Sequence, residues 1–327
     1  MVTTMSLAAL AVRLRGFSAA PVVEPLAVAE PGPHDVLVRM RLAPINPADL
    51  NVIQGTYGRL PTLPATLGNE GVGEVIAAGP SANLAPGTLV RPLDGVGSWC
   101  SLLTAPAERF LALPNDLPDD QAAQLTINPA TAWAVLDAFG PLEPGAVIAV
   151  NAALSGVGRS LIALGKARGL RVLALVRRPE VVSEALALGA AAVVLEGREA
   201  SKELRGHGPI QLALNQVGGD SALSLCKALA PGGTLVTIGA LSKQPLTLAN
   251  GPVIFNELRM AGFWVSRWFE RTPADRLAAM ISELAGLVRA RDLHLPVAEI
   301  ILLAEITRAL ALAADPGRRG KVLLDCR

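Results

Sequence analysis

The pattern of hydrophobic and polar positions changes near residue 120, and this change divides the chain into two kinds of structure. Before it, residues 35–45 (DVLVRMRLAPI) alternate between apolar and polar side chains, as in a strand with one buried face. Apolar runs at 70–80 and 87–95 are bounded by Gly and Pro and predict further strands. The run LAALAVRLRG (7–16) predicts a first strand. This part of the chain is therefore predicted to be rich in β-structure and poor in helix.

After residue 120, short apolar runs without polar alternation are separated by segments of helical periodicity. Such runs predict parallel strands in a sheet that helices cover on both faces, which is the doubly wound α/β arrangement. The strands are expected at 146–151, 171–176, 191–195, 210–217 and 233–240. Two more helices, at 272–291 and 303–315, precede a closing strand at 321–326.

The chain length of 327 residues is large for one domain, so two domains are expected. We predict an α/β protein in which residues 1–122 begin a β-rich domain and residues 123–266 form a doubly wound, Rossmann-type domain. Residues 267–327 are expected to return to the β-rich domain.

Charge and composition exclude several classes of protein. The net charge is +1, which favours neither nucleic acid nor an anionic membrane surface as a partner. No apolar run reaches the roughly 18 residues that a membrane-spanning helix needs without a charge or a Gly. The three cysteines are far apart and odd in number, which fits a reducing compartment.

The N-terminal stretch is open to two interpretations. It carries Arg13 and Arg15 and no acidic residue before Glu24, as a transit peptide would. The same residues fit a first strand of the domain, and we favour the strand. Together with the high Ala, Gly and Pro content, this leads us to expect a cytoplasmic protein of bacterial type rather than a mitochondrial one.

The stretch AVIAVNAALSGVGRSLIALG (146–165) predicts a strand, a turn and a helix. Glycines in such a turn let the backbone approach a pyrophosphate, whose charge then lies at the helix N-terminus. Gly156 and Gly158 are present, but the first Gly of the usual motif is absent, and Ala152, Ala153 and Leu154 stand there. The flanking strand and helix make this turn, with Ser155 and Val157, a candidate dinucleotide site.

The second strand of this unit ends at Val176 and is followed by Arg177 and Arg178. An NAD site would place Asp or Glu here for the ribose hydroxyls, whereas guanidinium groups suit a 2′-phosphate. The pair therefore favours NADPH over NADH. The alternative is that both arginines are solvated charges at a strand end.

The layout resembles the medium-chain dehydrogenase/reductase superfamily over essentially the whole chain. Zinc dehydrogenases of that superfamily have a Cys and a His where this chain reads INPADL and GNEGVG, with Asn46 and Asn69 at those positions. Neither amide is a good zinc ligand, so no metal is expected. Without a metal to acidify a hydroxyl, alcohol oxidation is excluded.

A zinc-free reductase can still deliver hydride to the β-carbon of an α,β-unsaturated carbonyl. Such an enzyme must stabilise the enolate oxygen and supply a proton to the α-carbon. Tyr57 is the only tyrosine of the chain and lies in the segment NPADLNVIQGTYGRLPTLP (46–64), which is read as a loop. Its phenol is a candidate for either task, and the alternative is a turn aromatic that covers the core.

A closer resemblance, to one family within this superfamily, rests on the segments INPADLNVIQGTYGRLPTLP, LTINPATAWAVL, SGVG, LALNQVGG, GGTLVTIGALSKQP, GFWVSRW and RGKVLL. They resemble the mitochondrial-type trans-2-enoyl-CoA (enoyl thioester) reductases, from about residue 45 to 324. The resemblance implies an NADPH-dependent reduction of enoyl thioesters, bound to CoA or acyl carrier protein, on a GroES-like catalytic domain and a Rossmann domain. It implies catalytic roles for Tyr57 and Trp264. It implies cofactor contacts for Asn46, Asn128, Thr131, Ser155, Gly156, Val157, Gly158, Arg177, Arg178, Gly239, Ala240, Leu241, Phe263, Trp264, Val265 and Lys321.

Several alternatives stay open at this point. Trp264 can be a packing residue, Lys321 a surface lysine at a strand start, and Asn128 a residue that ends a helix before Pro129. The function can instead be that of a zinc-free NADPH:quinone oxidoreductase, or of a crystallin-like or regulatory relative that only binds NADPH. By resemblance, a homodimer is expected through edge strands near residues 235–268, where unpaired edges would be a liability.

Overall fold

The computed structural model describes residues 6–93 and 95–327. The chain divides into two compact units, one made of the described residues up to Thr126 together with Leu295–Arg327, the other of Ile127–His294. The predicted return to the first unit starts at residue 267, whereas in the structure the chain rejoins that unit at Leu295. Residues 267–294 lie with the second unit because α9 (Val265–Arg271) and α10 (Ala274–Arg289) both contact α3 (Asn128–Ala138).

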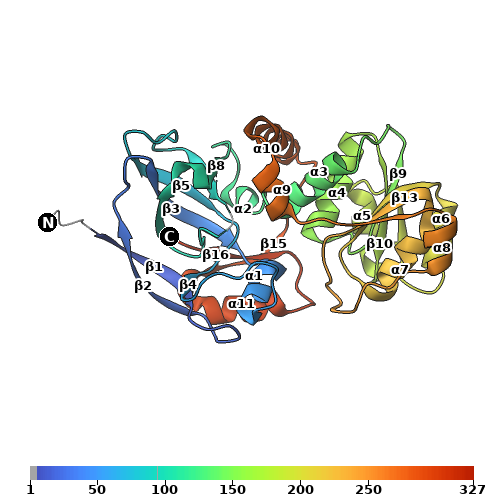
Figure 1. Cartoon of the computed structure of the whole chain (residues 1–327), viewed down its shortest axis with the longest axis horizontal. Coiled ribbons are helices and arrows are strands. Elements are labelled where there is room, and N and C mark those ends of the chain that lie inside the picture. Colours follow the sequence, from blue (N-terminus) through green and yellow to red (C-terminus); the bar gives the residue numbers. More distant parts are fainter. Residues whose placement is uncertain (1–5, 94) are drawn as a thin grey trace. The chain divides into compact units, whose positions relative to one another are not determined.

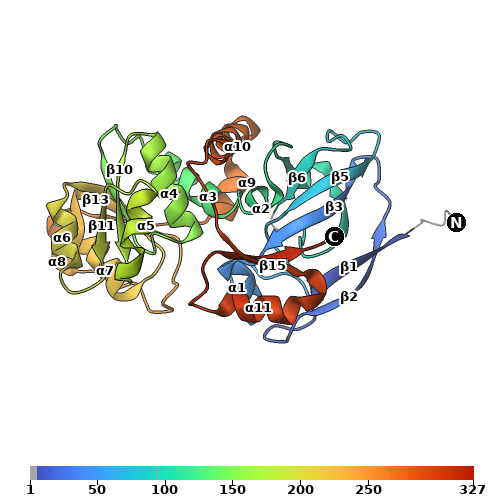
Figure 2. The same ribbon diagram turned by 180° about the vertical axis from the view of Figure 1, so that it is seen from behind.

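The first unit is built on two sheets (Figures 1 and 2). In the smaller one, β1 lies between β2 and β4, and all pairs are antiparallel. In the larger one the order is β15-β16-β3-β5-β6-β8, with β7 also paired to β3. The strands are β1 (Ser6–Leu14), β2 (Val22–Ala29), β3 (Asp35–Pro44), β4 (Ala65–Thr66), β5 (Val72–Ala78), β6 (Leu89–Pro92), β7 (Leu102–Pro106), β8 (Phe110–Ala112), β15 (Val297–Leu302) and β16 (Lys321–Asp325).

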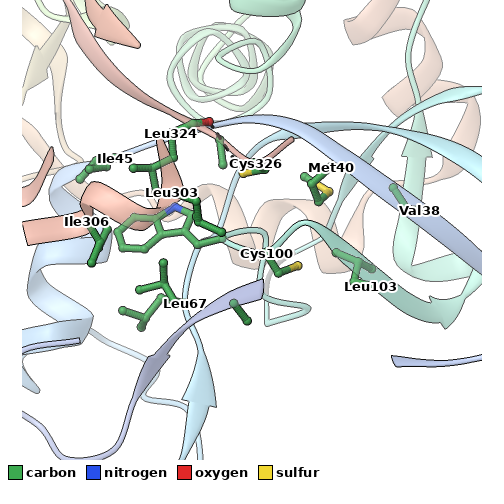
Figure 3. Packing of buried hydrophobic residues seen from close by; sticks show 14 of the residues in the cluster. Val38, Met40, Ile45, Leu67, Cys100, Leu103, Leu303, Ile306, Leu324 and Cys326 are labelled. Carbon is green, nitrogen blue, oxygen red and sulfur yellow. Dashed lines mark hydrogen bonds between the residues drawn. The ribbon is translucent and has the colours of Figure 1, made fainter. Parts of the chain in front are cut away.

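The core of this unit joins both ends of the chain. Trp99 is fully buried, and its indole N–H donates to the Pro44 carbonyl at 3.3 Å. Figure 3 shows Leu324 and Cys326 from the C-terminal end among core residues from the N-terminal part, such as Ile45. Because β16 pairs antiparallel with β3, the C-terminal residues complete a core that the first 126 residues begin.

The second unit contains a six-stranded parallel sheet in the order β11-β10-β9-β12-β13-β14. Every residue of β9 is buried, which explains why these strands read as continuous apolar runs. The strand order reverses between β9 and β12, and such a switch point is where open α/β sheets bind ligands. The strands are β9 (Val147–Val150), β10 (Arg171–Val176), β11 (Ala192–Leu195), β12 (Ile210–Asn215), β13 (Leu229–Thr237) and β14 (Arg259–Gly262).

The helices agree with the periodicity except in four places. The segment from residue 46, read as a loop, begins with α1 (Pro47–Gln54), and α6 (Ala200–Gly206), α8 (Asn250–Phe255) and α9 were not predicted. The pattern missed them because they are short, with six to eight residues. The others are α2 (Asp119–Ala122), α4 (Gly156–Ala167), α5 (Val182–Ala187), α7 (Gly219–Ala228) and α11 (Ile306–Ala314), with short 3-10 turns at Ala107–Arg109, Pro179–Val181 and Leu303–Glu305.

An ion-pair network attaches α10 to α3 and α4. Glu283 accepts two hydrogen bonds from Arg168, at 3.0 and 2.9 Å, and one from the Trp133 indole at 2.6 Å. Burial raises the pKa of Glu283, but these hydrogen bonds outweigh burial and keep the pKa below its ordinary value. The Arg168 and Arg276 guanidinium groups also lie over the Trp133 ring, 5.4 and 5.0 Å from its centroid.

The predicted β-rich first part and doubly wound second part are confirmed by these sheets. Among the described residues, no helix is both long and apolar enough to cross a membrane.

Candidate functional site

In the first unit, Asn46 lies at the N-cap of α1 and is buried, with 2% of its surface exposed. Its backbone N–H donates to the Asp49 carboxylate at 2.8 Å, so an acid in the first turn fixes the start of the helix. Pro47 follows at the first helical position, where its missing N–H has no consequence. The local sequence thus fixes the Asn46 backbone at the helix start, from which its side chain makes tertiary contacts.

Those tertiary contacts form a cluster of polar groups around the Asn46 amide. Its Nδ2 donates to Glu70 at 2.9 Å, and its Oδ1 accepts from the Lys321 ammonium at 2.8 Å. Glu70 is fully buried, and its other oxygen accepts from the backbone N–H of Thr126 at 2.9 Å. Because the amide nitrogen faces a carboxylate, the amide oxygen must face the lysine. We call Asn46, Asp49, Glu70 and Lys321 the charged cluster.

Burial shifts the ionisation of two members of the charged cluster. Burial raises the pKa of Asp49 to about 7, although hydrogen bonds from the Asn46 backbone and from the Asn69 amide oppose the shift. Burial lowers the pKa of Lys321 to about 8, partly offset by attraction to Glu70. Lys321 therefore stays cationic at neutral pH, with one hydrogen bond to a neutral amide as its described contact.

The two positions expected to replace zinc ligands both belong to this neighbourhood. Asn46 is bound to Glu70 and Lys321, and Asn69 donates to Asp49 at 2.8 Å. Within residues 6–93 and 95–327, no group of three or more His, Cys, Asp or Glu side chains is gathered as a metal site would be. Hydrogen bonds between side chains thus organise the region that a metal organises in zinc dehydrogenases.

Tyr57 follows α1 in a bend and is half-buried, with its ring packed against the core of the first unit. The helix ends at Gly55, whose φ of 74° is left-handed and whose N–H bonds back to Val52. A Cβ at Gly55 would lie 3.1 Å from the Phe17 side chain, so the positive φ and this close contact both favour glycine here. The sequence QGTYG therefore fixes Tyr57 on a short, shaped connection directly after the helix that Asn46 starts.

In the second unit, the predicted dinucleotide turn joins β9 to α4. Ser155 is the N-cap of α4, and its hydroxyl accepts from the Gly158 N–H at 3.0 Å. The N–H groups of Gly156 and Val157 lie in the first helical turn, where the helix itself provides no acceptor. A twelve-residue helix with such donors at its N-terminus suits a phosphate, so the turn fits the pyrophosphate of a dinucleotide.

The two glycines of this turn lie close to neighbouring atoms. A Cβ at Gly158 would lie 2.4 Å from the Ala153 carbonyl oxygen, so only glycine fits there, and one at Gly156 would lie 3.0 Å from the Asn128 side chain. Asn128 thus borders the turn, and its predicted contact with the cofactor stays a prediction. Ala152 adopts a left-handed φ of 47°, which costs a non-glycine residue about 1 kcal/mol.

A network of buried amides, which the sequence reasoning missed, lies beside the same turn. Asn151 donates to Asn215 at 2.8 Å, across the switch point between β9 and β12. Gln216 donates from its side chain to the Asn151 carbonyl at 2.7 Å, and its own backbone N–H donates to the Asn151 side chain at 2.7 Å. We call Asn151, Asn215 and Gln216 the amide network. The missed signal is that each of its members is a polar amide near the C-terminal end of an otherwise apolar predicted strand, 146–151 or 210–217.

The remaining predicted contacts in this unit divide into two groups. Gly239 and Leu241 lie beside Gln216, whose carbonyl accepts from the Leu241 N–H at 2.9 Å; Ala240 is exposed between them. The Phe263 N–H donates to Thr237 at the end of β13, so Phe263 follows the same edge of the sheet. These residues are brought to the carboxyl ends of the strands, where the turn also lies.

The other group of predicted contact residues has its described contacts outside the dinucleotide turn. The Thr131 hydroxyl donates to the Ile127 carbonyl within its own chain segment, at 2.6 Å. Trp264 is the N-cap of α9, followed by Val265, and its ring carries the Arg267 guanidinium at 5.8 Å. Arg177 and Arg178 are exposed after β10, and Arg178 also lies 3.7 Å from Glu180. The open position of the two arginines suits a phosphate that arrives from solvent.

Two family models match the chain. The alcohol dehydrogenase GroES-like domain matches residues 32–115, and the zinc-binding dehydrogenase model matches residues 156–283. The fold and both models define a medium-chain dehydrogenase/reductase, with the GroES-like and Rossmann-type domains that the sequence predicted.

More specific relatives narrow the class. A rat protein named mitochondrial enoyl-[acyl-carrier-protein] reductase is 41% identical over 86% of this chain and 78% of its own length. The solved complex of Etr1p with NADP and crotonyl-CoA superposes with a TM-score of 0.88 at 28% identity, over 98% of this chain and 100% of that one. A structure named putative NADPH:quinone reductase from Bacillus thuringiensis reaches 0.89 at 28% identity, over 98% and 99%. The chain belongs to the family of the mitochondrial enoyl-[acyl-carrier-protein] reductases, oxidoreductases that act on CH–CH bonds.

These relatives confirm the predicted resemblance and correct one expectation. The proteins from rat, mouse, human and Dictyostelium discoideum are all named mitochondrial. The expectation of a cytoplasmic protein of bacterial type is therefore wrong, because the relatives point to mitochondria. The composition misled because Ala, Gly and Pro content reports folding properties of the chain and carries no address.

Proposed function

We propose that this protein reduces the trans-2 double bond of enoyl thioesters, carried by CoA or acyl carrier protein, with NADPH as the hydride donor. The observation that carries the proposal is the charged cluster. In this cluster the Lys321 ammonium donates a hydrogen bond to Asn46, which stands at the position of a zinc ligand in zinc dehydrogenases. The chain is also 41% identical to a protein named enoyl reductase. The charge of the enolate develops on the thioester oxygen, and hydrogen-bond donors can stabilise it there without a Lewis acid.

NADPH, when bound, supplies the hydride. The residues of the second unit suit its binding: the first turn of α4 offers N–H groups for the pyrophosphate, and Arg177 and Arg178 offer guanidinium groups for the 2′-phosphate. Solved relatives with NADP support this assignment. Gly239, Leu241 and Phe263 line the same edge of the sheet and suit the nicotinamide end.

We assign Tyr57 to the substrate carbonyl. Its phenol either donates a hydrogen bond to the developing enolate oxygen or gives the proton to the α-carbon, and it is the only tyrosine of the chain. Lys321 is cationic at neutral pH and offers two further N–H donors beyond the one bound to Asn46. It is assigned to an anionic or carbonyl group of the cofactor or substrate.

The test is the oxidation of NADPH with trans-2-hexenoyl-CoA, in the wild type and in Tyr57→Phe. We expect a lower kcat by about 100-fold in the variant, with NADPH affinity unchanged, because one donor to a developing oxyanion is lost. Thr56→Ala is the matched control, since Thr56 is the exposed neighbour on the same turn. No turnover of enoyl-CoA by the wild type, or a Tyr57→Phe variant as fast as the wild type, would contradict the proposal.

The likeness to a structure named NADPH:quinone reductase favours a second candidate, reduction of quinones. Quinone reduction also uses hydride from NADPH without a metal. Side-by-side kinetics with trans-2-hexenoyl-CoA and 1,4-benzoquinone decide between them. A kcat/KM for the enoyl thioester above that for the quinone supports the first proposal, and the reverse order supports the second.

We also propose a homodimer joined at β14. This strand is one edge of the six-stranded sheet, and the preceding α8 exposes Ile254 and Phe255, the latter by 83%. Light scattering on the wild type is expected to give twice the chain mass of 33.8 kDa, and Phe255→Glu to shift the mass toward that of one chain. A wild type that is monomeric at micromolar concentration would refute the dimer.

A further inference from the structure

Gln216 is the member of the amide network whose side chain bonds to the dinucleotide turn, and it follows the last residue of β12. Its exposed fraction is 5%, so its polar groups must be satisfied within the protein. The Gln216 backbone N–H donates to the Asn151 side chain, and the Gln216 side chain donates to the Asn151 backbone carbonyl. The two residues thus form a reciprocal pair that ties the end of β12 to the end of β9.

The contact reaches the strained residue of the dinucleotide turn. The Gln216 Nε2 lies 2.7 Å from the Asn151 carbonyl oxygen and 3.5 Å from that of Ala152. Ala152 is the left-handed residue, and it begins the segment Ala152, Ala153 and Leu154, which lacks the first glycine that dinucleotide turns usually carry. A donor aimed at the carbonyl before Ala152 opposes rotation of the peptide that would release the left-handed conformation.

The same side chain also orients the cap of α4. The Ser155 hydroxyl donates to Gln216 Oε1 at 2.8 Å and accepts from the Gly158 N–H at 3.0 Å. Since its proton is committed to Gln216, the hydroxyl presents its lone pair to the helix. The N–H groups of Gly156 and Val157 are then left as the donors of the first turn for a phosphate.

We propose that Gln216 is a positioning residue for the pyrophosphate. It keeps Ala152 left-handed without a glycine there, and it keeps Ser155 in its capping orientation. The inference rests on the proposed function only in taking NADPH as the ligand. Its test uses binding rather than turnover, so it does not depend on which substrate is reduced.

The experiment measures dissociation constants for NADPH and for adenosine 2′-phosphate, a probe that lacks the 5′-phosphate and so does not reach the turn. Gln216→Met keeps the volume and removes the hydrogen bonds. We expect the Kd for NADPH to rise about tenfold and the Kd for adenosine 2′-phosphate to stay within about twofold of the wild type. Gln211→Met, an exposed position on the same strand, is the matched control.

Ala152→Gly provides the rescue. In the Gln216→Met background a glycine adopts the left-handed conformation without help, so we expect it to recover at least about half of the lost NADPH binding free energy. Alone, it should change the Kd by less than about threefold. Should Gln216→Met not fold, Gln216→Asn, which is one methylene shorter, is expected to give the same selective loss.

Three results would overturn the inference. One is NADPH binding by Gln216→Met as tight as by Gln211→Met. Another is an equal loss of NADPH and adenosine 2′-phosphate, which general loosening of the domain would produce. The last is a double variant no better than Gln216→Met. A wild type that binds neither NADPH nor adenosine 2′-phosphate would instead refute the cofactor assignment of the proposed function.

Discussion

The two buried polar regions of this protein differ in charge: one contains ionisable groups and the other contains neutral amides. The charged cluster of the first unit buries two carboxylates near one ammonium, and the pKa values of Asp49 and Lys321 move to about 7 and about 8. The amide network of the second unit buries neutral groups: Asn151 and Asn215 have no exposed surface, and Asn151 is bonded on both sides. Burial of charge opposes folding, whereas a satisfied amide network stabilises it.

This difference in charge suggests that the amide network has a structural role and the charged cluster a functional one. Amides that bond one another across the switch point fix backbone positions, which is what a phosphate-binding turn requires. A lysine whose burial lowers its pKa is kept at a cost to stability, and perturbed ionisation of this kind is concentrated at functional sites. The comparison can be tested because substitutions in the two regions are expected to change stability in opposite directions.

The largest effect is expected from Asp49→Asn, as a change in how stability depends on pH. The pKa of Asp49 is raised from 3.8 to about 7 in the folded protein, so the folded state keeps a proton that the unfolded chain releases. Stability therefore falls as pH rises from about 4 to 7, by about 4 kcal/mol from this group. The amide of the variant does not titrate, so the substitution removes this dependence.

Urea unfolding at a series of pH values measures the effect. The control is Asp275→Asn, an exposed acid in the first turn of α10. A stability profile of Asp49→Asn between pH 4 and 7 that runs parallel to that of the wild type would contradict the buried, protonated carboxyl.

Asn215→Leu is expected to destabilise the protein by about 3 kcal/mol, because it strands three buried donors. The Asn215 oxygen accepts from the Asn151 side chain and from the N–H groups of Val217 and Gly218. Chemical denaturation measures the loss, and Asn250→Leu, on the exposed start of α8, serves as control. A loss equal to that of the control would show that the amide network contributes no stability.

Arg177→Ala combined with Arg178→Ala should weaken NADPH binding by about 2 kcal/mol, a factor near thirty, and leave NADH binding unchanged. Both arginines are exposed and lie outside the amide network. Titration with both cofactors measures the ratio, with Arg198→Ala as an exposed control. An equal effect on NADPH and NADH would remove the arginines from 2′-phosphate recognition.

The smallest change in stability is expected from Lys321→Met, and it has the opposite sign to Asn215→Leu. Removal of a partly buried ammonium relieves its desolvation, while Asn46 loses one donor, so a net gain of about 1 kcal/mol is expected at pH 7. Enoyl reduction should fall in the same variant. Lys202→Met, on the exposed face of α6, is the control, and a clear loss of stability at Lys321 would show that the charged cluster stabilises the fold.

Much of the fold was readable before the structure. Alternation in 35–45 predicted β3, and the apolar runs at 146–151 and 171–176 predicted β9 and β10, because buried strands leave a recognisable apolar pattern. The short helices α1, α6, α8 and α9 were missed, since a helix of about two turns has too few positions to show a period. The extent of the second unit was also not readable, because α10 has the same amphipathic pattern whichever unit it packs against.

For the candidate site, too, some features could be predicted from the sequence and others could not. The glycines of the turn and the lone tyrosine are local signals, and the sequence by itself determined that a dinucleotide turn and a phenol on a shaped connection exist. Only the tertiary structure decided that Lys321 forms a hydrogen bond with Asn46, 275 positions away in the chain, and that Gln216 forms two hydrogen bonds with Asn151. Such contacts depend on strand register and on the return of the C-terminal segment. The physical reason is that periodicity and turn chemistry act between near neighbours, whereas a buried hydrogen bond depends on which distant backbone the folded core brings within about 3 Å.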